Sequence, residues 1–181
     1  MVVCCRDVKD GDSIVDIKAR ISKANQAFAM LKTIWRSKNI KIRTKMKIYK
    51  SNVLGVLLYG SVSVCQQLEV FQNKVLGVFW PNKISNTELY ERTGMEMISV
   101  MIKRRRWRWL GHVQRMPPSN IPKVALRWTA DGRRSRGRPK ETWRRSIERE
   151  MRHHGLNWDT ARHQAEDRKK WRSLVEALCA T

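Results

Sequence analysis

The chain is poor in cysteine, proline, glycine and acidic side chains. Its 181 residues include four Cys, five Pro and nine Gly, and only 16 Asp and Glu stand against 38 Lys and Arg. So few helix breakers favour long regular elements over a strand-and-turn architecture. No stretch approaches the ~18 consecutive apolar residues of a membrane span, and the first apolar run is too short for a signal peptide, so we expect neither membrane insertion nor secretion.

The cysteines and histidines do not form a recognisable site. The four cysteines, an adjacent pair and two distant singletons, are Cys4, Cys5, Cys65 and Cys179. This spacing fits neither a disulfide framework nor a zinc site, so we expect reduced thiols and a location in the cytoplasm or the nucleus. Neighbouring helical side chains such as His153 and His154 point about 100° apart, and His112 has no Cys or His three or four residues away. We therefore expect no metal and no cofactor.

Positive charge is concentrated in one segment. Residues 101–145 contain 15 Lys and Arg against 2 Asp and Glu, a net charge of +13 out of a total of +22. Like charges that crowd one surface repel each other and do not stabilise a fold. A polyanionic partner explains such an excess best, and nucleic acid is the commonest polyanion, so we expect RNA or DNA bound through its phosphates.

Hydrophobic periodicity predicts an all-α helical bundle that begins with an αα-hairpin. An apolar stripe from Ile14 to Trp35, with Ser13 as its expected N-cap, would pack against a second helix from Ile42 to Leu58. Further helices are expected near 68–79, from Ser85 or Asn86 to Gly94, and over 97–114, 141–154 and 159–178, with a basic loop at 129–140. The punctuation divides the chain into segments 1–80, 81–128, 129–140 and 141–181.

Five short strings, in this order, resemble a known family. They are DIKARISKANQAFAMLK (Asp16–Lys32), VLLYGS (Val56–Ser61), WPNKISNTELYERTG (Trp80–Gly94), RRRWRWLGHVQRMP (Arg104–Pro117) and RGRPKETWRR (Arg136–Arg145). Together they resemble the C-terminal part of the reverse transcriptase of LINE-type (non-LTR) retrotransposons. The resemblance implies that residues 1–80 are thumb-like and that the remainder corresponds to the distal region of such an enzyme.

The same resemblance implies that the chain is not a polymerase by itself. The family carries its paired catalytic aspartates in a palm upstream of the DIKARI-like helix, and this sequence lacks that region. Two-metal chemistry needs acidic side chains held together, whereas Asp7, Asp10, Asp12 and Asp16 are more typical of a solvated helix start. No Ser–His–Asp or Cys–His set can be assembled either, so we expect no catalytic residue.

The expected nucleic-acid interface has two parts. On a helix, Arg104, Arg105 and Arg108 share one side, and Trp109 continues the apolar face of Ile98 and Ile102. Trp107 falls toward the polar side, where it would stack on an unpaired base or, alternatively, belong to the core. The second part, Arg136-Gly137-Arg138-Pro139, would bind phosphates without sequence preference or lie in a minor groove. The expected binding residues are Lys103, Arg104, Arg105, Arg106, Trp107, Arg108, Arg133, Arg134, Arg136, Gly137, Arg138 and Lys140.

The sequence thus predicts a nucleic-acid-binding remnant of a retrotransposon reverse transcriptase without its palm. The alternative from another class is a transposon-derived helical relic or protein-interaction module with no nucleic-acid role. The dependence of binding on salt separates the two, because phosphate contacts release counterions.

Overall fold

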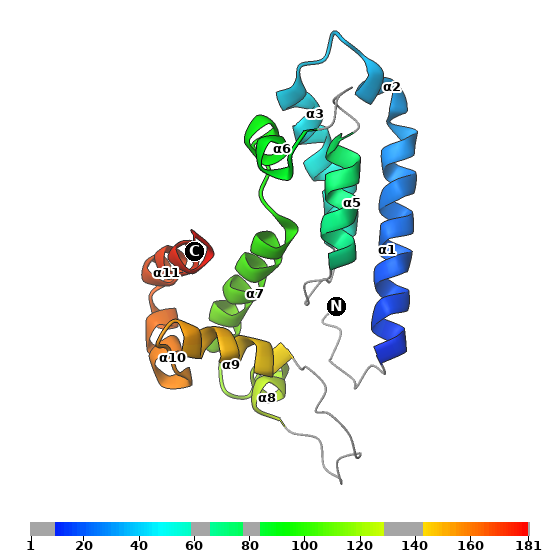
Figure 1. Cartoon of the computed structure of the whole chain (residues 1–181). Helices are drawn as coiled ribbons and strands as arrows, with labels where there is room; N and C mark the ends of the chain where they lie inside the picture. Colours follow the sequence, from blue (N-terminus) through cyan, green and yellow to red (C-terminus); the bar gives the residue numbers. More distant parts are fainter. Residues whose placement is uncertain (1–9, 59–65, 78–83, 129–142, 181) are drawn as a thin grey trace. The chain divides into compact units, whose positions relative to one another are not determined.

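The computed structural model describes residues 10–58, 66–77, 84–128 and 143–180, and every regular element in these ranges is a helix. The expected all-α class is therefore confirmed for the described part of the chain. In chain order the elements are α1 (Asp10–Met30), α2 (Lys32–Arg36), α3 (Ile42–Ile48), the π-helix η1 (Tyr49–Leu54), α4 (Gly55–Leu57), α5 (Gln66–Gly77), α6 (Asn86–Thr93), α7 (Ile98–Gln114), α8 (Ile121–Arg127), α9 (Trp143–His153), α10 (Trp158–Glu166) and α11 (Arg168–Ala180) (Figure 1).

The chain divides into two compact units, Met1–Ile102 and Lys103–Thr181, and the division falls within α7. Each unit buries its own set of apolar side chains. The four segments expected from the sequence follow the Gly and Pro punctuation, whereas the two units follow the packing. The expected basic loop at 129–140 lies outside the described residues.

The first unit is built on the expected αα-hairpin. Helix α1 packs against η1 and α4, which lie on the returning arm, and it also contacts α5 (Figure 1). Ala24 from α1 and Tyr49, Val53 and Leu57 from the returning arm are fully buried in the core of this unit. Burial of an amphipathic stripe against a partner helix supplies most of a helix's stability, and here the stripe that starts the chain does so.

The first helix differs from the prediction at both ends. It begins at Asp10, so Ser13 lies inside the helix and is not its N-cap. At Leu31 the backbone leaves the helical region, with φ −96° and ψ 18°, and a separate short helix, α2, follows. Trp35 of α2 stacks on Phe28 with ring centroids 5.1 Å apart and donates from Nε1 to the Phe28 carbonyl at 2.7 Å. This indole therefore holds α2 to the end of α1.

The returning arm is not one continuous α-helix, because residues Tyr49–Leu54 form a π-helix. The Ile48 carbonyl accepts hydrogen bonds from Ser51 Oγ and from Asn52 Nδ2, both at 3.1 Å. Side-chain donors of this kind are common where the regular i to i−4 ladder is disturbed. The wider turn still leaves Tyr49, Val53 and Leu54 in the core.

Both ends of α6 are as predicted. The Ser85 hydroxyl accepts from the Glu88 backbone N–H at 3.2 Å and caps the first turn. Gly94 follows the last turn with φ +59°, a left-handed conformation that glycine adopts without the strain of a side chain. Beyond it, Gln72 of α5 donates to the Glu96 carbonyl at 2.9 Å and so ties α5 to the start of α7.

The second unit contains the C-terminal part of α7 together with α8 to α11. Its fully buried core includes Trp107, Leu110 and Val113 from α7 and Ile147 from α9. Ile147 and Met151 face inward, and Gly155 follows the helix with φ +65°. Helix α8 lies outside the helices expected from the sequence. Pro122 stands in its first turn, where proline fits.

The prediction of one continuous helix over 159–178 is wrong, because this range contains two helices. Asp167, with φ −89° and ψ 112°, separates α10 from α11. Its Oδ1 accepts from the backbone N–H groups of Lys169 at 2.7 Å and Lys170 at 3.2 Å. An aspartate that caps the next helix in this way stabilises a break that apolar periodicity alone does not reveal.

Helix α11 lies directly on the backbone of α7 at Gly111. A Cβ at Gly111 would overlap the indole ring of Trp171. From this position Trp171 Nε1 donates to the Trp107 carbonyl at 3.0 Å, and the two indole rings lie 5.9 Å apart. The absence of a side chain at Gly111 therefore permits the contact that joins the two helices.

We expect Gly111→Ala to destabilise the protein by about 1–3 kcal/mol or more, because the added methyl group must displace a buried indole. Gly55→Ala is the matched control: this glycine is helical and the nearest atom to its added Cβ is a backbone oxygen 4.0 Å away. The control should be neutral or stabilise by up to about 1 kcal/mol. Urea unfolding followed by Trp fluorescence measures both. Equal stability of the two variants would contradict the contact.

Candidate nucleic-acid interface

The basic run Lys103–Arg108 lies on α7, at the start of the second unit. Its side chains differ sharply in exposure. Arg105 and Arg108 are exposed, Lys103 and Arg104 are half-buried, and Arg106 and Trp107 are buried. The run is therefore not one solvated basic face, since its members alternate between the surface and the interior of the unit.

One carboxylate of α11 binds two of these arginines. Glu176 lies 3.0 Å from Arg104 Nε through one oxygen and 2.8 Å from Arg108 through the other. Arg104 and Arg108 are four residues apart, so they stand on the same side of α7, as expected from the sequence. The hydrogen bond from Arg108 and the positive charges of both arginines hold the pKa of Glu176 below its usual range. Folding thus places a counter-charge on the predicted phosphate site.

A second carboxylate, from α9, binds Arg106 and Trp107. Glu150 pairs with Arg106 through one oxygen and accepts from Trp107 Nε1 at 2.7 Å through the other. Arg106 is 8% exposed and Trp107 is fully buried. Trp107 is therefore a core residue and is not placed to stack on a base, so the expectation that it falls toward the polar side is wrong and the core alternative holds. Arg106 likewise faces the interior.

Lys103 completes the contacts between α7 and α11. Its Nζ donates to the Leu178 carbonyl at 2.6 Å, in the last turn of α11. A cation at this position also complements the negative end of the helix dipole. Lys103, Arg104 and Arg108 therefore all contribute to fastening α11, in addition to any ligand that they bind.

Trp109 does not continue the buried face of Ile98 and Ile102, contrary to the prediction. It is 39% exposed and packs edge-on against Trp143 of α9, with ring centroids 5.0 Å apart at 90°. Leu110 and Val113 face the core instead. Covering helices on two sides of α7 decide which residues are buried, and those helices are far away in the sequence.

The second part of the predicted interface is not described. Arg133, Arg134, Arg136, Gly137, Arg138 and Lys140 lie outside the described residues. The described chain resumes at Trp143, where Arg144 pairs with Glu148 at 2.9 Å. Burial raises the pKa of Glu148, but hydrogen bonds from Arg144 and from Trp158 outweigh it and hold this pKa below its usual value.

The structure also draws attention to basic residues that the sequence analysis did not select. No Asp or Glu occurs between residues 17 and 68, although this span contains 11 Lys and Arg. The net charge of residues 1–60 hides this span, because the four aspartates Asp7, Asp10, Asp12 and Asp16 all precede it and lower that net charge. Counting uninterrupted stretches without acid would have found it. Within it, α2, the turn after it and α3 carry Lys32, Arg36, Lys38, Lys41, Arg43, Lys45 and Lys47.

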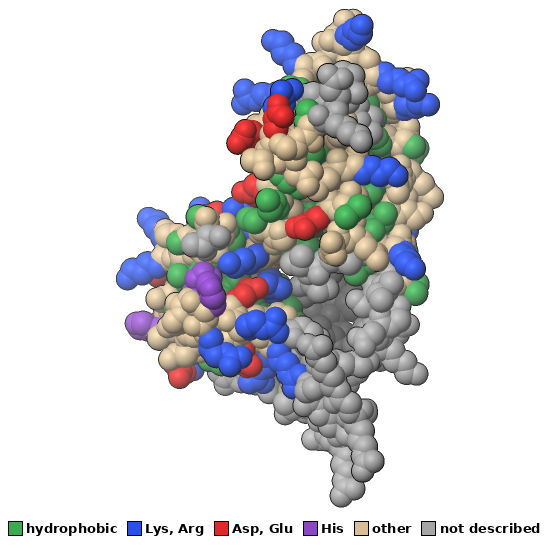
Figure 2. Space-filling view, in the orientation of Figure 1, with side chains coloured by type: hydrophobic (Ala, Val, Ile, Leu, Met, Phe, Trp, Pro, Cys, Tyr) green, Lys and Arg blue, Asp and Glu red, His purple; other side chains and the backbone are tan. Residues whose placement is uncertain are grey.

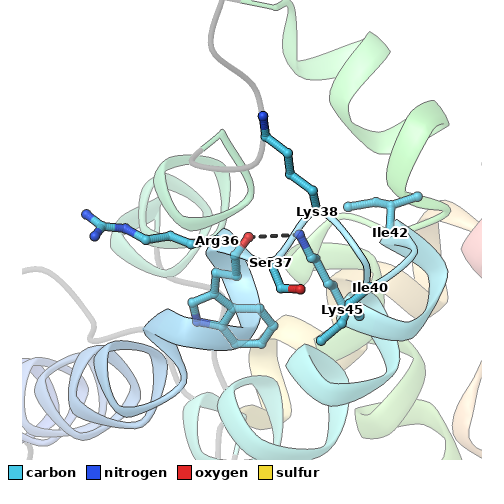
Figure 3. A pocket seen from close by; sticks show the side chains of 7 residues that line it. Arg36, Ser37, Lys38, Ile40, Ile42 and Lys45 are labelled. Carbon is cyan, nitrogen blue, oxygen red and sulfur yellow. Dashed lines mark hydrogen bonds between the residues drawn. The ribbon is translucent and has the colours of Figure 1, made fainter.

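A shallow hollow of about 400 Å³ lies at the turn between α2 and α3. It is lined by Trp35, Arg36, Ser37, Lys38, Ile40, Ile42 and Lys45. Lys45 folds back so that its Nζ donates to the Trp35 carbonyl at 2.8 Å, while Arg36 and Lys38 lead away from the turn in different directions (Figure 3). The turn is thus fastened from inside and presents its other cations outward.

Metal and membrane sites are not found in the described ranges. Within them, no group of three or more His, Cys, Asp and Glu side chains is placed to hold a metal ion. The described helices also include none that is long and apolar enough to cross a bilayer. These ranges therefore contribute basic surface and helical packing.

We expect the protein to lose stability as the pH falls from about 6 to about 3. The folded-state pKa values of Glu148 and Glu176 lie below their usual range, so their ion pairs stabilise the folded state above the unfolded-state pKa and are lost as the pH falls through the folded-state value. Glu176→Gln removes one titrating group and should reduce the loss, as measured by urea unfolding across this range. An identical loss in Glu166→Gln, whose described ion-pair partner is His163, would contradict the assignment to Glu176.

The comparisons with known proteins give one short match. The family described as Domain of unknown function (DUF6451) matches residues 27–59, which include the end of α1, α2, α3, η1 and α4. This is much less than half of the chain, so the match concerns the hairpin region alone. No curated protein and no solved structure matches the chain.

Proposed function

We propose that the chain binds RNA or DNA through its phosphates, and that it does so in the second unit through α7 and the basic segment that precedes α9. The observation that carries the proposal is the 15 Lys and Arg against 2 Asp and Glu in residues 101–145. An excess of this size raises the local concentration of a polyanion and dominates non-specific affinity for nucleic acid.

Contact with phosphate requires an exchange at α7. Arg105 and Arg108 are exposed, and Arg108 shares Glu176 with Arg104. A guanidinium group binds a carboxylate and a phosphate with the same two-pronged geometry, so an incoming phosphate competes with Glu176 for the same donors. Lys103 and Trp107 contribute by holding the helix in place, and the sequence of residues 133–140 supplies further cations.

The proposed origin is the C-terminal part of a LINE-type non-LTR reverse transcriptase. Some residues of the strings that carry the resemblance begin, end or join helices in the described part of the chain. Gly111 of WLGH accepts the indole of Trp171, Ser85 of KISNTELYERTG caps α6, and Gly94 ends it. Such positions tolerate few other residues, which gives a physical reason for these strings to be distinctive.

A protein-interaction module is the second candidate. Ile121, Val124 and Trp128 are 77%, 51% and 62% exposed, and they lie three and four residues apart along α8 and its end. Exposed apolar side chains on one helix side are typical of a surface that a partner covers. Binding to nucleic acid with strong salt dependence favours the first candidate over this one.

We expect affinity for duplex DNA to fall about a thousandfold between about 50 and 200 mM salt if about six phosphates are engaged. Glu176→Gln removes the negative charge that Arg104 and Arg108 share and should raise the affinity roughly tenfold at the lower salt, equivalent to about one charge-assisted hydrogen bond. Fluorescence anisotropy with a labelled duplex measures both effects.

The control for this test is Glu166→Gln, which removes the same charge from an exposed position of the same unit. Its affinity should rise much less. An equal rise in both variants would mean that total charge and not α7 controls binding. Binding that is weak and insensitive to salt would contradict the proposed function.

We also propose that the chain alone does not extend a primer on an RNA template with magnesium. Two-metal catalysis requires acidic side chains held within reach of the same pair of ions. The acidic side chains that the structure describes are instead bound to arginines, as at Glu150 and Glu176, or distributed over several helices. Template-dependent incorporation by the purified chain, measured beside an intact reverse transcriptase, would contradict this statement.

A further inference from the structure

The first unit contains basic residues that folding leaves without counter-charges. Lys18, Lys23, Lys32, Arg36, Lys38, Lys41, Arg43, Lys47 and Lys50 are all exposed. None of them forms an ion pair with a carboxylate in the described part of the chain. The acidic residue before this span, Asp16, already pairs with Arg20. The carboxylates that the structure describes therefore leave these nine cations without an ion pair.

On α7 and α9 of the second unit, several basic side chains are paired instead. There, carboxylates from α9 and α11 bind Arg104, Arg106, Arg108 and Arg144. The density of Lys and Arg in the sequence is higher around α7, yet the density of unpaired cations among described residues is higher around α2 and α3. Ionic attraction for a polyanion depends on the unpaired charge and not on the count of basic residues.

The turn between α2 and α3 presents these cations from a fixed backbone. Lys45 donates to the Trp35 carbonyl at 2.8 Å, and the Ser37 hydroxyl accepts from the Asn39 backbone N–H at 3.3 Å. Trp35 is itself stacked on Phe28. Figure 2 shows Lys and Arg side chains over this end of the unit. Cations on a rigid turn lose less conformational freedom on binding than cations on a loose segment.

Acidic residues near this surface come from α6, which packs against α3. Glu88 of α6 pairs with Arg92 of the same helix. Glu91 of the same helix is exposed and forms no ion pair in the described part of the chain. Both carboxylates belong to α6, whereas Arg36, Lys38 and Lys41 belong to α2 and the turn after it.

We propose that the turn between α2 and α3 carries a second, independent nucleic-acid surface, formed by Arg36, Lys38, Lys41 and Arg43, so that one chain binds two separate strands. It extends the proposed nucleic-acid function from the second unit to the first. The cations bind backbone phosphates, and the half-buried Ile40 and exposed Ile42 of the hollow contact an unpaired base.

Nucleic acid fits this surface better than an anionic membrane does. A membrane-binding element needs a continuous apolar face that inserts between the lipids. The exposed apolar side chains of this region, Met30 and Ile42, are isolated and belong to different helices. The cations, in contrast, follow one another over three consecutive stretches of chain, which suits a line of phosphates.

The test is the number of short strands bound per chain. The full chain is titrated with a fluorescent oligonucleotide of about eight nucleotides, near the lower range of a single binding site, at about 50 mM salt. Sedimentation velocity then gives the number of strands on each monomer. We expect two strands per chain, and one after the combined substitution Arg36→Gln, Lys38→Gln, Lys41→Gln and Arg43→Gln.

The matched control removes the same charge from exposed positions of α10 and α11, through Arg162→Gln, Lys169→Gln, Lys170→Gln and Arg172→Gln. It should still bind two strands. An equal decrease in both variants would overturn the proposal in favour of bulk charge. Circular dichroism of each variant verifies that the helices are intact.

The remaining outcomes separate this inference from the function on which it rests. One strand per chain that survives the turn substitutions overturns the second surface and leaves the site on α7. A third outcome is that the chain binds one strand, that the turn substitutions abolish this binding and that Glu176→Gln does not change it. This outcome supports the surface on α2 and α3 and overturns the site on α7. If the turn substitutions abolish binding to anionic vesicles but leave strand binding unchanged, the nucleic-acid assignment of this surface is overturned in favour of a membrane surface.

Discussion

The contact of Trp171 with the bare backbone at Gly111 determines the organisation of the second unit. It fixes α11 against α7, and the hydrogen bond from the indole to the Trp107 carbonyl prevents α11 from sliding along that helix. With this register set, Glu176 reaches Arg104 and Arg108, and the end of α11 reaches Lys103. The ion pairs on the basic run are therefore a consequence of one close approach between two helices.

The same contact explains why part of the basic run on α7 is neutralised by a carboxylate of its own unit. Carboxylates of α9 and α11 are brought to α7 by packing, whereas the hairpin of the first unit has no acidic residue over most of its length. Two ways of handling positive charge thus coexist in one chain. The basic run on α7 is partly neutralised by described carboxylates, and the cations of the turn between α2 and α3 form no described ion pair.

The sequence predicted best what is decided locally. The start of α6 at Ser85 or Asn86, its end at Gly94 and the end of α9 near residue 154 depend on residues within one or two turns, and these were predicted. The break at Asp167 is equally local, but a capping aspartate inside an apolar repeat reads as an ordinary surface residue. Helix α8 was missed because proline in a first turn resembles proline after a helix.

The features that depend on distant residues could not be read from the sequence. The exchange of roles between Trp107 and Trp109 depends on α9 and α11, which cover α7 from positions tens of residues away. A helical projection gives the angle between two side chains about the helix axis, but it does not show which side of the helix the rest of the chain will bury. The pairing of three α7 arginines with Glu150 and Glu176 has the same origin.

The carboxylate held between Arg104 and Arg108 has a consequence for selectivity. Because Glu176 is tethered to the same folded unit, its effective concentration at these guanidinium groups is far above that of any single small anion in solution. An isolated phosphate or chloride ion therefore competes poorly. Under the proposed function, a polymer that presents several phosphates in a row would gain at neighbouring cations the free energy that it loses in displacing Glu176 from this pair. The internal carboxylate would then favour a linear polyanion over a single small anion.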